Sequence, residues 1–247
     1  LGFVVLLYVT DRPAEARWLG KQESAWLIST LESERRLIEK SRTVSLWRSF
    51  WDPKVLLLAL NYFGIVTASL GMLLFLPQMV KQLGLSNMQV GWVTMIPYIC
   101  GALGMLTWGF VSDRMSERRW NLFGGCLVAA VGLALAGKFI GTPWSVVGMS
   151  IAAIGLYGSK GPFWSMPSMF LTGTAAAAGI AWINSLGNLG GFFGPSIVGW
   201  VKDWTGSFAG GLYALAALAL MSALISALWL HIPRLEHRRE FAEAAAA

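Results

Sequence analysis

The chain of 247 residues has few charged residues, which make up 13% of it, against about 25% in an average soluble domain. Hydrophobic residues make up 55%. A soluble domain of this size needs more polar residues to cover its surface, and a disordered chain has fewer apolar ones. The composition therefore excludes both classes and predicts an integral membrane protein with several spans.

Residues that commonly carry chemistry are also scarce. The two cysteines, Cys100 and Cys126, fall inside apolar runs without a neighbouring ligand, so we expect neither a disulfide nor a metal site. The two histidines, His231 and His237, lie at or beyond the last apolar run. The apolar runs contain no paired acids, no Ser–His or Cys–His pair and no metal-ligand cluster, so we expect no enzyme and no cofactor.

Six apolar runs are long enough to cross a bilayer as helices, which takes about 20 residues each. They cover residues 55–80, 90–111, 121–140, 144–166, 178–201 and 207–232. A shorter run at 1–9 looks like the end of a preceding helix, and because the chain starts within it, we expect a fragment of a longer protein or a truncated one. Residues 10–54 form a long loop, and residues 233–247 form a polar tail.

The basic residues indicate the orientation of these runs. If the runs alternate in direction, one side receives nine basic residues between 11 and 54 together with Arg114, Arg118, Arg119, Arg234, Arg238 and Arg239. The other side receives Lys81, Lys138 and Lys202. The positive-inside rule places the first side in the cytoplasm. The net charge of +6 then reflects membrane topology, and we expect no nucleic acid as a partner.

The long loop contains one predicted helix, over residues 20–40. Leu27, Leu31 and Ile38 lie near one helical face, with charged residues opposite. Gly20 followed by Glu23 resembles a weak capping box. Such a helix either lies on the membrane surface or braces the bundle, or it is a solvated linker. Both interpretations stay open at this point.

The ends of two apolar runs share a pattern. The run 90–111 leads into WGFVSDRM, with Gly109 and Asp113, and the run 178–201 leads into VGWVKDWTG, with Gly199 and Asp203. In the alternating arrangement the two aspartates face opposite sides of the membrane. One pattern in two opposite topologies predicts two three-helix repeats related by inversion, which is typical of secondary transporters.

The loop GFVSDRMSERR, which begins at Gly109, resembles the cytoplasmic loop of the major facilitator superfamily, whose pattern is G-x-L-A-D-R-x-G-R-R/K-R. Gly109, Asp113 and Arg114 match it, whereas Ser116 replaces the second glycine and the basic pair is shifted by one place. The stretches YVTDRPAEARWL, FLPQMVK, GPFWSMP and FLTGTAAAAGIAWINSLGNLGGFFGP are similar to the anion:cation symporter family within that superfamily. Members of that family carry tartrate, phthalate, sugar acids and hydroxyphenylacetate.

The resemblance implies an all-α integral membrane fold, namely the six-helix C-terminal lobe of such a transporter with two inverted three-helix repeats. It implies transport of a small organic anion across the inner membrane by alternating access, coupled to protons or to sodium. The partners would be the lipid bilayer and an N-terminal six-helix half. The alternatives are a drug or metabolite exporter of the same superfamily and a non-functional truncated half.

The resemblance also implies a role for the loop at Asp113, because in the family this loop is a latch between helices that holds one conformation. The candidate latch residues are Gly109, Asp113, Arg114 and Arg118. A carboxylate just beyond a helix end pairs with arginines and with N–H groups at a neighbouring helix N-terminus. The alternative is a plain charge cluster that fixes topology.

Polar residues inside the apolar runs are costly and usually face the interior of the bundle. The candidate substrate-binding residues are Asn61, Tyr62, Lys160, Trp164, Asn184 and Asn188. Asn184 and Asn188 are spaced i, i+4, so both amides point to one helix face and can donate to carboxylate oxygens. Tyr62 and Trp164 each offer an aromatic surface and a donor, and by resemblance they and Asn184 fall on or near cavity-lining positions. The alternatives are amide bonds between helices and aromatic packing or anchoring.

Lys160 lies well inside an apolar run, whereas Lys138 lies two residues from the end of its run. Lys160 either attracts an anionic substrate or pairs with a carboxylate of the other half, or it extends its ammonium group to the membrane interface. No aspartate or glutamate lies in the middle of any run. A proton-coupled symporter usually needs a buried carboxylate to load and release protons, so we expect the proton carrier in the N-terminal half.

Overall fold

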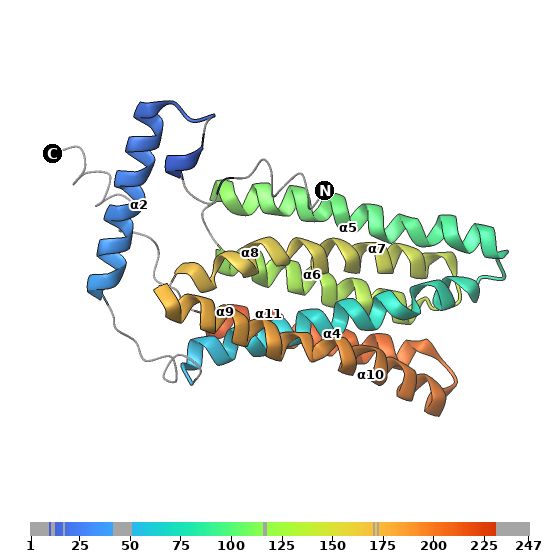
Figure 1. Ribbon diagram of the computed structural model, residues 1–247. Helices are drawn as coiled ribbons and strands as arrows, with labels where there is room; N and C mark the ends of the chain where they lie inside the picture. Colours follow the sequence, from blue (N-terminus) through green and yellow to red (C-terminus); the bar gives the residue numbers. More distant parts are fainter. Residues whose placement is uncertain are drawn as a thin grey trace.

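The computed structural model describes residue 10, residues 13–16, 18–41, 51–115 and 118–169, residue 171, and residues 173–230 (Figure 1). The side chains of residues 34–41 and 173–175 are outside this description. Every regular element in the described residues is helical, as the composition predicts. The first two are the 3-10 helix η1 (Pro13–Glu15) and the helix α2 (Lys21–Ser41).

A bundle of helices follows, and its six predicted spans alternate in direction (Figure 1). They are α4 (Pro53–Lys81), α5 (Asn87–Met115), α6 (Arg118–Lys138), α7 (Pro143–Gly158), α8 (Lys160–Ser165), the 3-10 helix η2 (Pro167–Met169), α9 (Gly173–Asn188), α10 (Gly190–Thr205) and α11 (Phe208–Leu228). Four of these, α4, α5, α6 and α11, are each long and apolar enough to cross a membrane as a single helix.

The other two predicted spans are broken helices. The span predicted at 144–166 consists of α7 and α8, which are interrupted at Ser159, and the span predicted at 178–201 consists of α9 and α10, which are interrupted at Leu189. Pro162 follows the first interruption, and because it has no N–H group to bond the carbonyl of the residue four places before it, it weakens the helix there. At the second, Gly190 and Gly191 follow the break, and glycine is a poor helix former.

The six predicted spans form two groups of three. The first group is α4, α5 and α6, and the second is α7 with α8, α9 with α10, and α11. α4 begins at one end of the bundle, and α7 begins at the other (Figure 1). α5 packs against α7 as α10 packs against α4, and α6 packs against α7 as α11 packs against α4. α6 and α11 pack against each other. Each of these contacts between the groups has a counterpart, which agrees with the two inverted three-helix repeats predicted from the sequence.

Two ends of the bundle differ in charge. We call the end that carries Arg114, Arg118 and Arg119 the arginine end, and the end that carries Lys81, Lys138 and Lys202 the lysine end. The separation follows directly from the alternating helix directions (Figure 1).

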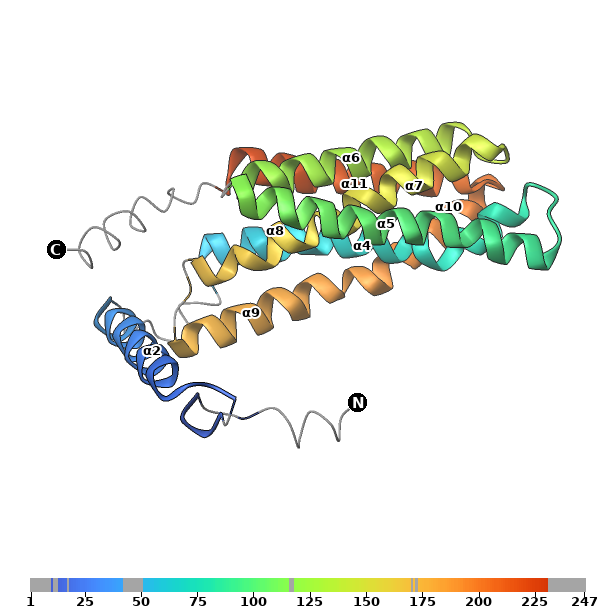
Figure 2. The same cartoon turned by 90° about the horizontal axis from the view of Figure 1, so that it is seen from above.

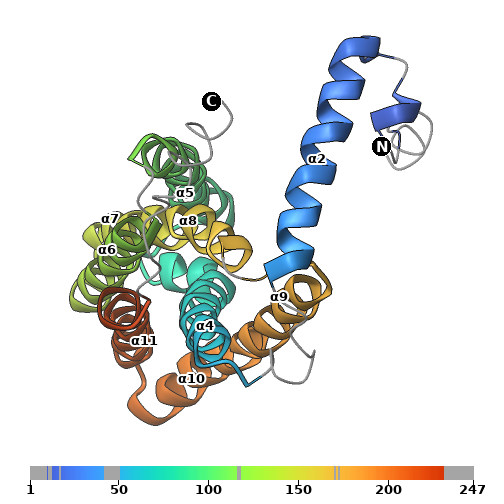
Figure 3. The same cartoon turned by 90° about the vertical axis from the view of Figure 1, so that its left-hand side faces the viewer.

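The loop helix α2 lies at the arginine end and runs across the axes of the bundle (Figures 1 and 3). The N–H group of Gly20 donates to Oε2 of Glu23 at 3.0 Å, so half of the predicted capping box is present. Of the predicted apolar face, Leu31 is 47% exposed, and the side chain of Ile38 lies outside the described residues.

Glycines hold α6 and α7 at very short range. A Cβ atom added to Gly132 would lie 2.2 Å from the backbone nitrogen of Ala152, and one added to Gly148 would lie 2.5 Å from that of Ala136. Gly155 meets Gly125 and Ala129 in the same way. Small residues let helix backbones approach closely in lipid, where no hydrophobic effect drives helices together. The backbones of α6 and α7 are therefore closely packed.

We expect Gly132→Ala to destabilise the protein by about 1–3 kcal/mol, because the new methyl group meets backbone atoms that cannot move independently. Gly91→Ala on α5 is the matched control, since a Cβ atom at Gly91 meets nothing within 4 Å. Thermal unfolding in detergent measures both variants. A melting temperature of Gly132→Ala equal to that of Gly91→Ala would contradict the close α6–α7 contact.

Candidate functional site

An aromatic cluster joins α4 to α8. The ring of Tyr62 stacks on that of Phe163 with 4.9 Å between centroids, and it meets the edge of Trp164, also at 4.9 Å. A Cβ atom on Gly187 of α9 would lie 2.1 Å from Cδ1 of Tyr62, so the Tyr62 ring also fills the space in front of α9. α4 lies between α8 and α9 at this end of the bundle (Figures 2 and 3). Tyr62, on the first predicted span, therefore contacts two others at once.

The two amides of α9 share one face, as their spacing predicts. Nδ2 of Asn188 donates to Oδ1 of Asn184 at 2.8 Å, and both side chains are exposed. Gly187, which touches Tyr62, precedes Asn188 directly. The amide pair therefore borders the aromatic cluster, and it keeps free donor capacity because each amide can donate two hydrogen bonds.

Lys160 begins α8, directly after the break in the helix. Its Nζ lies 4.5 Å from the centroid of the Tyr157 ring, a cation–π contact, and its side chain is half-buried. Trp164 lies four residues further along α8, so the two side chains share one side of that helix. In the described part of the chain no carboxylate forms an ion pair with Lys160. The ammonium group therefore lies beside an aromatic surface and not beside a carboxylate in that part of the chain.

Asn61 does not belong to this group, contrary to the expectation from the sequence. It is fully buried between α4 and α11, where Nδ2 donates to the Ser222 carbonyl oxygen at 2.7 Å and to Oγ of Ser226 at 2.9 Å. Oγ of Ser222 donates back to the Asn61 carbonyl oxygen at 3.0 Å. Asn61 thus joins two helices, which is the alternative role of an amide in a membrane bundle.

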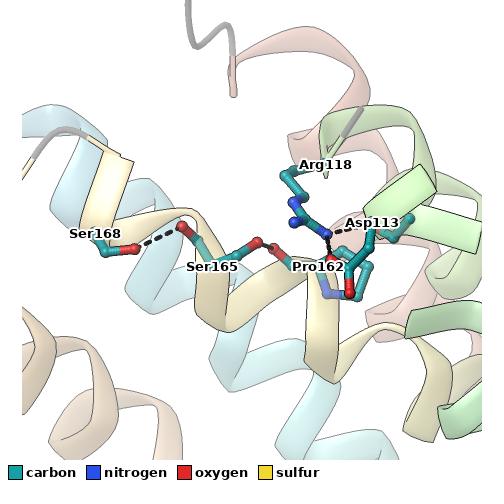
Figure 4. A network of polar contacts seen from close by, with 6 residues as sticks. Asp113, Arg118, Pro162, Ser165 and Ser168 are labelled. Carbon is teal, nitrogen blue, oxygen red and sulfur yellow. Dashed lines mark hydrogen bonds and ion pairs between the residues drawn. The ribbon is translucent and has the colours of Figure 1, made fainter. Parts of the chain in front are cut away.

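Asp113 and Arg118, at the two sides of the loop at the arginine end, form an ion pair. Nη1 of Arg118 lies 2.6 Å from Oδ1 of Asp113, and it also donates to Oγ of Ser112 at 2.9 Å (Figure 4). Asp113 is in the last turn of α5, and Arg118 is the first residue of α6. The pair therefore closes the turn between these helices. Arg114 is exposed, and Asp203, the counterpart of Asp113 in the second repeat, has no ion pair among the described residues.

Arg119 has a role that the sequence did not indicate. Its Nε donates to the Ser226 carbonyl oxygen at 3.1 Å, and its Nη2 donates to the carbonyl oxygen of Ala227. These carbonyls belong to the last turn of α11, where helical partners are missing and a positive charge is favourable. The adjacent arginines therefore tie α5, α6 and α11 together at one end.

Gly109 connects this loop to the helix that carries Lys160. A Cβ atom on Gly161 would lie 3.8 Å from Cα of Gly109, so α5 and α8 cross at these two glycines. In Figure 4 Pro162, the next residue of α8, lies beside the Asp113–Arg118 pair. The five remaining candidate substrate-binding residues and the loop thus lie on adjacent parts of α4, α5, α8 and α9.

Comparisons with known proteins agree with this architecture. The family model described as "Major Facilitator Superfamily" matches residues 1–195 and 69–246. A protein of Agrobacterium vitis named "Putative tartrate transporter" is 46% identical over 226 residues, which are 92% of this chain and 52% of that protein. A "Quinolone resistance transporter" of Acinetobacter baumannii is 34% identical over 227 residues, 92% of this chain and 52% of that protein.

A solved structure has the same fold. The crystal structure of a fucose:proton symporter of E. coli matches with a TM-score of 0.69 at 15% identity, over 78% of this chain and 46% of that one. At such low identity the match concerns the fold alone. The chain spans about half the length of the curated relatives that it matches.

Proposed function

We propose that this chain, which belongs to the Major Facilitator Superfamily, is the C-terminal lobe of a secondary active transporter for a small organic anion. Tartrate, a sugar acid and an aromatic acid are the candidate substrates. The observation that carries the proposal is Lys160, a half-buried cation without a carboxylate partner in the described residues, which shares one side of α8 with Trp164. The Trp164 ring meets that of Tyr62, and α9 carries an exposed amide pair.

The chemistry of these side chains suits an organic acid. An ammonium group attracts a carboxylate, and its attraction is stronger in a partly dry site than in water. The amides of Asn184 and Asn188 can donate to hydroxyl or carboxylate oxygens, and the aromatic rings offer an apolar surface to the carbon skeleton. The 46% identity to a protein named as a tartrate transporter supports this class of substrate.

Transport by alternating access requires a second lobe, which we propose is a six-helix half outside this chain. The two lobes would rock against each other about a central site in the membrane. We propose protons as the coupling ion, with sodium as the alternative. No aspartate or glutamate is buried among the described residues, so the carboxylate that would carry a proton belongs to the other half in this proposal.

A second candidate function is export of an aromatic drug. The 34% identity to a protein named as a quinolone resistance transporter favours it. The half-buried rings of Tyr62 and Trp164, backed by the buried Phe163, offer the aromatic surface that such a compound needs. Both functions use the same surface. The two functions differ in the direction of transport and in whether Lys160 binds the transported compound.

Uptake in proteoliposomes separates the two functions. We expect the complete transporter to accumulate labelled tartrate or another organic acid from a panel when a pH gradient is imposed. We expect Lys160→Gln to raise the apparent KM for that acid at least about tenfold, because a charge-assisted hydrogen bond is lost. Lys138→Gln is the control: it removes a cation at the lysine end, where Lys138 lies 5.5 Å from the Phe139 ring. No accumulation of any acid, together with quinolone efflux, would favour the exporter; equal KM values for the two variants would remove Lys160 from the site.

We also propose that the loop of Asp113 is a conformational latch. α5 contacts α8 where Gly109 faces Gly161, so the Asp113–Arg118 pair at the end of α5 lies one turn from the helix that carries Lys160. Arg119 extends the connection to α11. Loss of the Asp113–Arg118 ion pair would then alter the rate at which the lobe changes between its conformations. It would not alter the insertion of the protein into the membrane.

We expect Asp113→Asn to lower the rate of transport several-fold while the amount of protein in the membrane stays the same, because the ion pair with Arg118 is lost. The exchanged pair Asp113→Arg with Arg118→Asp should recover part of the rate. Quantitative blotting of membranes alongside uptake measures both quantities. A wild-type uptake rate in Asp113→Asn would leave the loop with a topological role only.

A further inference from the structure

A hollow of about 500 Å³ opens at the lysine end of the lobe, far along the bundle from Lys160 and the loop of Asp113. Four helices border it, namely the end of α4, the start of α5, the end of α10 and the start of α11. Its lining residues are Pro77, Gln78, Lys81, Gln82, Asn87, Val90, Lys202 and Phe208.

The lining is positively charged and rich in donors. Two of its residues are lysines and three carry amides, and no acid belongs to it. Asp203 follows Lys202 on α10, but it is exposed and is not part of the lining. Lys81 and Lys202 come from helices of different repeats, so the tertiary fold brings their charges together around one space. Two ammonium groups without a carboxylate favour an anion between them.

The lysines are held toward the hollow by neutral groups. Nζ of Lys81 donates to Oδ1 of Asn87 at 2.5 Å, and Nζ of Lys202 lies 4.6 Å from the centroid of the Phe208 ring. Neither an amide nor an aromatic ring neutralises the ammonium charge. Each lysine therefore has an anchoring contact and keeps its charge and further donor hydrogens for a ligand.

Two helix N-termini add to the positive electrostatic potential in the hollow. α5 begins at Asn87 and α11 begins at Phe208, and both residues line the hollow. The N-terminus of a helix carries a partial positive charge that favours anions. The helix termini alone would not define a site, but here they coincide with a cavity and with two lysines.

We propose that this hollow binds an oxyanion, a carboxylate or phosphate group, at a site separate from the proposed substrate site. The group has two possible sources, the headgroup of an anionic phospholipid and a small anion in solution. Because the hollow opens at the end of the lobe, the binding is partly screened, and we expect it to weaken as the ionic strength rises.

The test uses the complete transporter in nanodiscs and two probes. Inorganic phosphate, titrated into phosphatidylcholine nanodiscs and followed by calorimetry, reports a soluble anion. Native mass spectrometry after exchange into vesicles that contain phosphatidylglycerol reports a retained lipid. The variant is Lys81→Gln with Lys202→Gln, and the matched control is Lys138→Gln, which removes a cation from the same end of the bundle but not from the hollow.

We expect the double variant to lose at least about tenfold in affinity for phosphate, or a comparable share of the retained phosphatidylglycerol, with Lys138→Gln within about twofold of the wild type. Loss in the phosphate arm identifies a soluble anion, and loss in the lipid arm identifies a headgroup; either supports the site. If the double variant and the control behave alike in both arms, the proposal is wrong. Tartrate uptake does not enter this test, so its result is independent of the proposed transport function.

Discussion

The close approach of helix backbones in the absence of water is the constraint on which the rest of this structure depends. A bilayer satisfies no backbone polar group, so the chain must be helical, and lipid offers no hydrophobic drive for helices to associate. Glycines allow the helices to associate instead, because helix backbones can pack closely where no side chain separates them. Gly132 and Gly148 bring α6 against α7, and Gly190 and Gly194 bring α10 against Thr67 of α4.

The same constraint shapes the candidate site. α4 packs against α9, α10 and α11, and its aromatic residue Tyr62 meets both α8 and α9. The two broken spans, interrupted at Ser159 and Leu189, are the first and second spans of the second repeat. Both contact Tyr62. Interrupted helices in a membrane are tolerated where protein surrounds them or where they line a polar cavity. The breaks next to Lys160 and Asn188 therefore coincide with the residues that carry the proposed anion chemistry.

Sequence reasoning placed helices at the six apolar runs and predicted the shared face of Asn184 and Asn188, because apolar length and helical period are local properties. It did not predict that two of these helices are interrupted. It missed that Asn61 and Tyr62, neighbours in sequence, face different helices, since only the packing of α11 decides which side of α4 is covered. It also missed Arg119, whose partners on α11 lie more than 100 residues away. The hollow at Lys81 and Lys202 joins different repeats and follows from the tertiary fold alone.

We propose that the arginine end faces the cytoplasm and that the lysine end faces the opposite side of the membrane, as the positive-inside rule predicts. Single cysteines at Ser86, between α4 and α5, and at Met115, at the end of α5, test it directly in a chain with both native cysteines replaced by alanine. We predict that a membrane-impermeant maleimide labels Ser86→Cys in intact spheroplasts and labels Met115→Cys only after permeabilisation. Equal labelling of both positions in intact spheroplasts would contradict the account.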